Sequence, residues 1–180
     1  MNRLYRFLPF AAALLIVIWM YNDKPDKDPT EKYDGDALVI GVIGEVPEIR
    51  EQHIRFRELT LDHLVERSDY AAGLDAIFIT NEKLPEAAEP RFAAVFKSAN
   101  IPFFFIGAEK GHFPYIDEEL SFEDMPDHGS GMYGSGYYQL SGKEQVWGFG
   151  LYNDTISDWN VRGMYSRILG KIETIKLEGI

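Results

Sequence analysis

Three short apolar segments without polar alternation stand out in the chain: residues 37–44 (ALVIGVIG), 75–80 (DAIFIT) and 101–107 (IPFFFIG). A run of this kind is typical of a strand that is buried on both faces, as in a parallel sheet covered by helices. Parallel strands need a crossover connection, which is almost always right-handed. The sequence therefore predicts an α/β layered domain with a mainly parallel central sheet.

The sequence predicts the secondary structure of one connection between these strands and leaves that of another open. After the second strand, Pro90 suits a first helical turn, and apolar residues follow it at helical spacing: Phe92, Val95, Phe96 and Ala99. After the first strand, two interpretations remain open. Residues 53–59 form either a further strand, followed by a helix that Thr60 caps, or part of one longer helix that begins at Pro47.

The C-terminal third follows a different pattern. Residues 111–136 are irregular and end in a glycine-rich stretch, residues 129–136 (GSGMYGSG), which we interpret as a flexible or tightly turned loop. Residues 137–140 and 145–152 predict a C-terminal β-hairpin. Apolar residues then recur at helical spacing from Val161 onward, and Ser157 is a suitable N-cap. We expect a C-terminal amphipathic helix whose apolar stripe faces the core.

The N-terminus carries the longest apolar run, residues 7–21 (FLPFAAALLIVIWMY), preceded by Arg3 and Arg6. As a helix this run spans about 22 Å, and Leu4 and Tyr5 can extend it. Snorkelling arginine side chains and local thinning of the bilayer can make up the remaining length. Residues 1–21 therefore predict an N-terminal transmembrane helix, in contact with the lipid bilayer through residues 4–21.

The residues on either side of this run predict whether it is cleaved and which way it crosses the membrane. Large residues occupy the positions where signal cleavage needs small ones, so we expect a retained anchor, with a cleaved export signal as the alternative. The arginines before the run favour a cytoplasmic N-terminus. Residues 22–36 are charged and contain two prolines, which predicts a solvated linker. Residues 37–180 then form a single extracytoplasmic domain at the cell membrane.

The charge balance narrows the choice of partners. The chain has 18 Lys and Arg and 29 Asp and Glu, and all the acids follow Tyr21. Because two of the 18 basic residues precede the apolar run, the part beyond it carries a formal charge of −13. Such a surface is repelled by phosphate backbones, so nucleic acid is not an expected partner. The chain has no cysteine, which excludes disulfides and thiol nucleophiles.

No motif with a known chemistry is present. The glycine-rich stretch lacks the following Lys-Ser and helix of a phosphate-binding loop, and no G-x-S-x-G or H-E-x-x-H sequence occurs. The acidic residues between 117 and 127 do not have the spacing of an EF-hand, although the sequence leaves open whether they bind a cation. We therefore expect no catalytic residue, no metal ligand and no cofactor.

A ligand site can nevertheless be placed by topology. In open α/β sheets, ligands bind beyond the carboxyl ends of the strands, at a switch in strand order. Polar residues follow these ends here, namely Glu45, Asn81, Glu82 and Glu109. They predict a site for a cation, an amine or a neutral polar molecule. Gly44 and Gly107, at the same edge, either let a ligand approach the backbone or simply serve turns.

Residues 101–107 (IPFFFIG) and 147–154 (WGFGLYND) resemble segments of small uncharacterised single-pass membrane-anchored proteins of Gram-positive bacteria. The resemblance covers the C-terminal part of the chain, implies a surface-tethered domain of unassigned role and transfers no site residue.

The sequence as a whole leaves two functions as expectations. The first is non-enzymatic binding or sensing of an unknown protein or small-molecule partner. The alternative is an enzyme or small-molecule binder with its site at the carboxyl ends of the strands.

Overall fold

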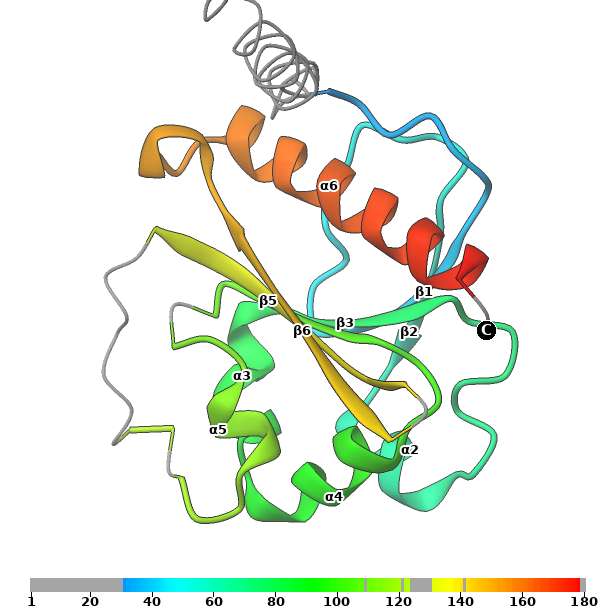
Figure 1. Ribbon diagram of the computed structural model, residues 1–180, viewed down its shortest axis with the longest axis vertical. Coiled ribbons are helices and arrows are strands. Elements are labelled where there is room, and N and C mark those ends of the chain that lie inside the picture. Colours follow the sequence, from blue (N-terminus) through cyan, green and yellow to red (C-terminus); the bar gives the residue numbers. More distant parts are fainter. Residues whose placement is uncertain (1–30, 109, 121, 124–130, 141, 179–180) are drawn as a thin grey trace, which may run out of the picture.

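The computed structural model describes residues 31–108, 110–120, 122–123, 131–140 and 142–178. These residues form an α/β structure around one six-stranded mixed sheet with the order β2-β1-β3-β4-β5-β6 (Figure 1). The strands are β1 (Val39–Ile43), β2 (Arg55–Leu59), β3 (Ala76–Ile79), β4 (Phe103–Ile106), β5 (Met132–Leu140) and β6 (Lys143–Gly150).

The sheet has a parallel half and an antiparallel half. β2, β1, β3 and β4 are parallel neighbours, whereas β5 runs antiparallel to β4, and β6 runs antiparallel to β5. The strands β3 and β4 are buried at every position, as their uninterrupted apolar sequences predict. The predicted α/β class is therefore confirmed, with a hairpin added to one side of the parallel strands.

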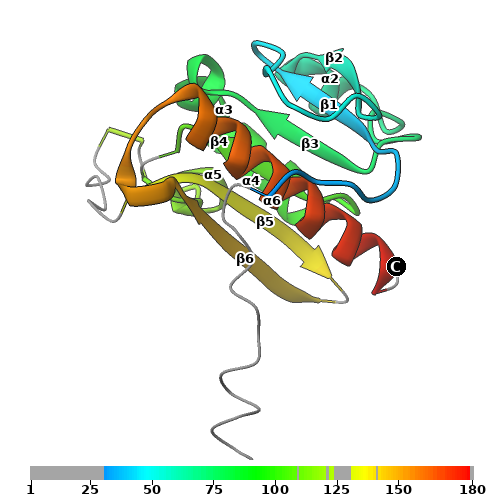
Figure 2. The ribbon, with the colours of Figure 1, turned by 90° about the horizontal axis from the view of Figure 1, so that it is seen from above.

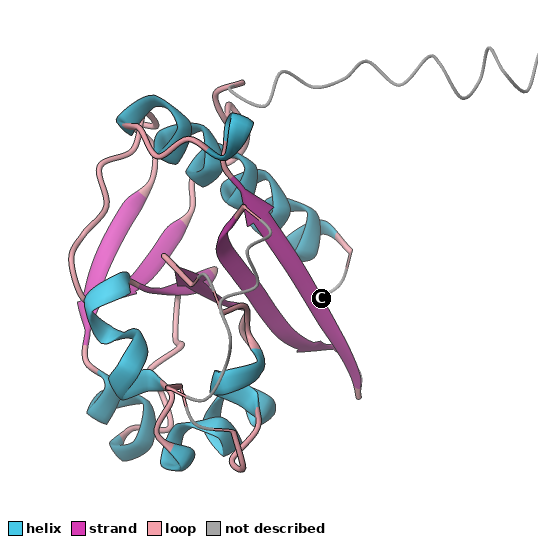
Figure 3. Cartoon of the chain, turned by 90° about the vertical axis from the view of Figure 1, so that its left-hand side faces the viewer, coloured by secondary structure: helices cyan, strands magenta, loops and turns pink. Residues whose placement is uncertain are grey.

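Helices cover both faces of this sheet (Figures 1 and 3). The first face carries α6 (Asp158–Leu177), which runs along the middle of the sheet when seen from above (Figure 2). The other face carries the short helices between the strands. These are α2 (Leu61–Glu66), α3 (Leu84–Ala87), α4 (Pro90–Ser98) and α5 (Phe113–Ile116), with a single 3₁₀ turn, η2 (Asn81–Lys83), before α3. A second 3₁₀ turn, η3 (Tyr152–Asp154), lies between β6 and α6.

Each face has its own hydrophobic core. Beneath α6, the fully buried Phe78, Phe104 and Ile168 pack together with residues of β1, β5 and β6. On the opposite face, Phe92 and Phe96 of α4 pack against strand residues such as Phe105. Successive residues of a strand point to opposite faces, so the runs AIFI and FFFI supply both cores at once.

The predicted C-terminal helix is confirmed, together with its cap. The Ser157 hydroxyl accepts a hydrogen bond from the backbone amide of Asn160, and Ile168 and Leu169 are completely buried. Arg167 lies off the apolar stripe of this helix, yet it is not fully exposed. Its side chain is half-buried and donates a hydrogen bond to the backbone carbonyl of Gly150, because α6 lies close to the end of β6.

The structure decides the open question after β1 in favour of a strand. β2 pairs with β1 from Arg55 onward, and α2 follows with Thr60 as its cap. The Thr60 hydroxyl accepts a hydrogen bond from the His63 amide, and the His63 ring accepts one from the Thr60 amide. Residues 44–54 form a loop without a helix, and Glu51 ties this loop to α6 by accepting a hydrogen bond of 2.6 Å from Ser166.

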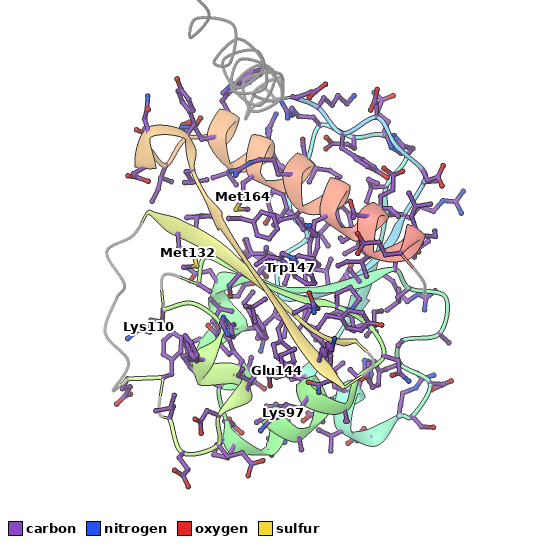
Figure 4. All side chains as sticks on the ribbon, in the orientation of Figure 1. Lys97, Lys110, Met132, Glu144, Trp147 and Met164 are labelled. Atoms are coloured by element: carbon purple, nitrogen blue, oxygen red, sulfur yellow. The ribbon has the colours of Figure 1, made fainter. Side chains whose placement is uncertain are left out.

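The interpretation of residues 129–136 as a loop is wrong for the residues from Met132 onward, which belong to β5. The glycines there make room for neighbouring side chains. A β-carbon on Gly136 would lie 2.8 Å from the Phe104 ring, and one on Gly134 would lie 3.3 Å from the sulfur of Met164. Met164 lies between α6 and the sheet in Figure 4.

The predicted anchor and the first part of the predicted linker lie outside the described residues. Within the described ranges, no helix is long and apolar enough to cross a membrane. The last part of the linker belongs to the fold rather than to solvent, because Tyr33 is buried. Its backbone amide donates to Glu51, and its hydroxyl donates to the carbonyl of Asp36.

Candidate functional site at the carboxyl edge of the sheet

The strand order creates one switch point in the parallel half of the sheet. From β1 the chain crosses to β2 on one side, and it then returns past β1 to β3 on the other side. The loops after β1 and β3 therefore leave the same edge in different directions. Open α/β sheets bind their ligands at such a switch point, beyond the carboxyl ends of the strands.

The two loops at this point are joined by Glu82. Its carboxylate accepts a hydrogen bond from the backbone amide of Glu45 and another, of 2.9 Å, from the Thr80 hydroxyl. Partial desolvation raises the pKa of Glu82, but the hydrogen bonds from its own amide, from Glu45 and from Thr80 outweigh this effect and hold the pKa below its usual value. Glu82 is thus an ionised carboxylate that fixes the loops.

The glycines at this edge allow close contacts within the chain. Gly44 has a φ of 110°, and the space beside its α-carbon is filled by the side chains of Thr80 and Glu82. Gly107 has a φ of 79°, and a β-carbon there would lie 3.0 Å from that of Asn81. Both glycines therefore serve tight turns whose backbone is covered by neighbouring side chains.

The structure thus brings three of the four sequence-predicted site residues to one edge. Glu45 and Glu82 are hydrogen-bonded to each other, and Asn81 lies beside Gly107 at the end of β4. Asn81 and Glu82 are both exposed. The fourth residue, Glu109, lies outside the described residues.

A pocket of about 520 Å³ adjoins this edge on the α6 side. Its volume is in the range of small-molecule sites. Three segments that are distant in sequence form it: the loop after β1, the start of β5 and the first two turns of α6 with the residues before them. The lining residues are Pro47, Glu48, Tyr133, Ile156, Ser157, Asp158, Val161, Arg162 and Tyr165.

Hydrogen bonds at the start of α6 fix the shape of this pocket. The side-chain amide of Asn160 donates to the carbonyls of Tyr152 and Thr155, at 3.1 and 2.8 Å. These bonds hold the segment before the helix, including Ile156, against the first turn. On the opposite side, the buried Glu51 holds the loop that carries Pro47 and Glu48, as described above. The pocket is therefore built from anchored segments.

Two tyrosines line the inner part of the pocket. Tyr165 is only 5% exposed, and its ring packs against Phe78 of the core. Burial raises the pKa of the Tyr165 hydroxyl, and the nearby Tyr133 and Glu82 raise it further. Within the described part of the chain the hydroxyl makes no hydrogen bond, and it is not one of the fully buried unpaired polar atoms, so it is open to the pocket. It is a neutral polar group at the edge of an apolar core.

Charged groups flank the tyrosines. Arg162 donates to the carboxylate of Glu48 across the pocket, at 2.6 Å, and Asp158 lies in the first turn of α6. Two exposed apolar side chains flank the start of α6, of which Ile156 lines the pocket. Ile156 and Trp159 are 67% and 59% exposed, and the Arg50 guanidinium lies 5.3 Å from the centre of the Trp159 ring. The pocket combines two carboxylates, one paired cation, aromatic rings and aliphatic surface.

The sequence reasoning missed the lining residues of this pocket. Tyr165 lies within the apolar stripe of α6, where it is indistinguishable from a core residue. Glu48 and Arg162 are 114 positions apart in the chain, so their pairing has no local signal. The one available signal was the pair of large apolar residues Ile156 and Trp159 among the polar residues between β6 and the apolar stripe of α6.

The described part of the acidic stretch lines a separate and smaller pocket, of about 370 Å³. Glu118, Glu119 and Glu123 line this pocket beside the start of α4. Among the described residues, no group of three or more His, Asp or Glu side chains could hold a metal ion. The sequence leaves open whether the complete stretch binds a cation, and residues 121 and 124–130 of it lie outside the described ranges.

Comparison with known proteins found no matching family model, no significantly similar curated protein and no significantly similar solved structure. The function is therefore inferred from the geometry of the chain.

Proposed function

We propose that this chain is a membrane-tethered α/β domain that binds a ligand or a partner outside the cytoplasm, and that its binding site is the pocket at the carboxyl edge of the sheet. The observation that carries this proposal is the position of the pocket. It adjoins the β1/β3 switch point, where open α/β sheets place their ligands, and anchored segments form its walls.

The tether rests on the sequence. The apolar run of residues 7–21 and the arginines before it favour a retained single-pass anchor with a cytoplasmic N-terminus. Even a fully extended chain from Tyr21 to Glu31 reaches only about 35 Å. The domain is therefore held close to the bilayer, which suits the recognition of a ligand or partner near the cell surface.

The state of Glu82 favours binding over catalysis at this edge. A general acid or base needs a pKa near the working pH, whereas hydrogen bonds hold the pKa of Glu82 below its usual value. The carboxylate is already engaged by donors of two loops. It is therefore a structural support for the edge, and an enzymatic function with Glu82 as proton carrier is disfavoured.

The proposal can be tested by mapping where small molecules bind. The full-length chain, placed in phosphatidylcholine nanodiscs and labelled at isoleucine and valine methyl groups, reports on the pocket through Ile156 and Val161. Val65 and Val146 are exposed elsewhere and serve as controls. The panel consists of amino acids, polyamines, dicarboxylates and monosaccharides.

We expect at least one class of compound to shift the Ile156 and Val161 signals in a saturable manner, while the Val65 and Val146 signals stay in place. A panel in which no compound moves the pocket signals would contradict the proposal. Shifts confined to the control signals would contradict it as well, because they would place binding elsewhere.

A further inference from the structure

We propose that the pocket at the carboxyl edge recognises a primary ammonium group carried on a short alkyl chain, as in a free diamine or a lysine side chain. This inference rests on the proposed function, since it names the chemistry of the ligand for the same site. Four features of the pocket support it, and each corresponds to one part of such a ligand.

The first feature is the charge at the pocket. Glu48 and Asp158 line it, and Glu82 lies close enough to act electrostatically on Tyr165. Arg162 is the one basic residue among the lining residues, and it is already paired with Glu48. Asp158 therefore leaves the lining with a net negative charge, which favours a cation over an anion.

The second feature is the Tyr165 hydroxyl. The side chain is 95% buried, but its hydroxyl is open to the pocket and makes no hydrogen bond to another described residue. An accessible hydroxyl oxygen of this kind can accept a hydrogen bond from a ligand. An ammonium group has three N–H donors, and one of them suits this oxygen.

The third and fourth features are the aromatic and aliphatic walls. Tyr133 lines the pocket beside Tyr165, and ring faces attract ammonium groups within about 6 Å of their centres. Pro47, Ile156 and Val161 supply aliphatic surface on the outer side. A methylene chain can lie along these three residues while its charged end reaches the tyrosines and carboxylates.

In the ion pair between Arg162 and Glu48, the Arg162 guanidinium competes with a ligand ammonium for the Glu48 carboxylate. A ligand ammonium that reaches Glu48 has to replace the Arg162 guanidinium, which lies 2.6 Å from the carboxylate. Removal of the guanidinium therefore frees Glu48 for the ligand. A neutral residue at position 162 should strengthen the binding of an amine, which is opposite to its effect on an anionic ligand.

The test uses three five-carbon probes that differ in their end groups: cadaverine, pentanediol and glutarate. Each is titrated into the full-length chain in phosphatidylcholine nanodiscs, and the methyl signals of Ile156 and Val161 are followed. We expect saturable shifts with cadaverine and none with glutarate or pentanediol over the same concentrations. A capped Gly-Lys-Gly peptide forms a second arm, which distinguishes a lysine side chain from a free diamine.

Substitutions then test which side chains of the pocket contribute to cadaverine binding. We expect Glu48→Gln and Asp158→Asn each to weaken cadaverine binding about two- to fivefold, and Tyr165→Phe to weaken it about tenfold. Arg162→Gln should strengthen it by a similar two- to fivefold factor. Two matched controls should leave the affinity unchanged. These are Glu66→Gln, an exposed carboxylate on α2, and Tyr138→Phe, a buried tyrosine outside the pocket lining.

The outcomes separate this inference from the proposed function. Equal binding of pentanediol and cadaverine, or tighter binding of glutarate, would overturn the ammonium proposal and leave the pocket as a binding site. Cadaverine shifts that are unaffected by Glu48→Gln, Asp158→Asn and Tyr165→Phe would overturn it too. A pocket that responds to no compound at all would overturn both.

Discussion

The carboxylate of Glu82 accepts a hydrogen bond from the backbone amide of Glu45, and this bond ties the loop after β3 to the loop after β1. The Thr80 hydroxyl donates to the same carboxylate, at 2.9 Å. Because Gly44 lies directly against both side chains, this edge of the sheet is closely packed at the switch point. The loop after β1, which also carries Pro47 and Glu48 of the pocket lining, is therefore fixed at its start.

Replacement of Gly44 by alanine should destabilise the chain by about 3 kcal/mol. The φ of 110° is unfavourable for any L side chain, and the added carbon would meet Thr80 and Glu82. Urea unfolding of the full-length chain in detergent micelles measures the effect. Gly142→Ala is the matched control, since Gly142 has a φ of 78° but no heavy atom within 4 Å of the added carbon. Equal losses at the two positions would mean that the contacts at Gly44 are unimportant.

Glu82→Gln should reduce the loss of stability in acid. The pKa of Glu82 is lower in the folded chain than in an unfolded one, so its contribution is complete above the ordinary carboxyl pKa and is lost as the pH falls through the folded value. The variant lacks this ionisation, so its unfolding free energy should be lower at neutral pH and fall less toward acid pH. Urea unfolding at a series of pH values measures this, with Glu66→Gln as the control. Parallel pH profiles for wild type and Glu82→Gln would refute the prediction.

The apolar stripe of α6 is predicted to be structural. Leu169 is completely buried, so Leu169→Ala should lower the unfolding free energy by roughly 2–5 kcal/mol. Leu177, on the last turn of the same helix, is 77% exposed and provides the same substitution in solvent. Leu177→Ala should stay within about half a kcal/mol of the wild type. Similar effects at both leucines would show that the stripe does not face a core.

The absence of cysteine allows a direct test of the membrane orientation. Val146 is exposed on β6, so a Val146→Cys variant carries one reactive thiol in the proposed extracytoplasmic domain. We expect a membrane-impermeant maleimide to label it in intact cells. Asn2→Cys, on the cytoplasmic side of the predicted anchor, should be labelled only after permeabilisation. The reverse pattern would invert the topology, and a mature chain that lacks the apolar run would restore the cleaved-signal alternative.

The parallel half of the fold was predictable because its signals are local. AIFI and FFFI are apolar at every position, and Phe92 and Phe96 repeat at helical spacing after Pro90. The start of β5 was not predictable, because its glycines are typical of loops. Their role depends on Phe104 and Met164, which approach them only in the folded chain.

The candidate site, too, was only partly predictable from the sequence. Topology placed Glu45 and Glu82 at one edge correctly, because residues after parallel strands leave the same side of a sheet. The adjoining pocket could not be read from the sequence, because β5 and α6 contribute Tyr133 and Tyr165 from distant positions. The sequence also could not show that Glu82 is engaged by the chain itself, since that depends on the turn at Gly44.

The most direct test of the central claim is to block the pocket covalently. In the cysteine-free chain, Ile156→Cys places a single thiol at the pocket wall, and Val146→Cys places one on β6 outside the pocket lining. Both variants are modified with benzylmaleimide, and cadaverine binding is followed through the Val161 methyl signal. We predict that modification at position 156 abolishes the cadaverine-dependent shift and that modification at position 146 leaves it intact. An unchanged shift after complete modification at position 156 would contradict the assignment of this pocket as the binding site.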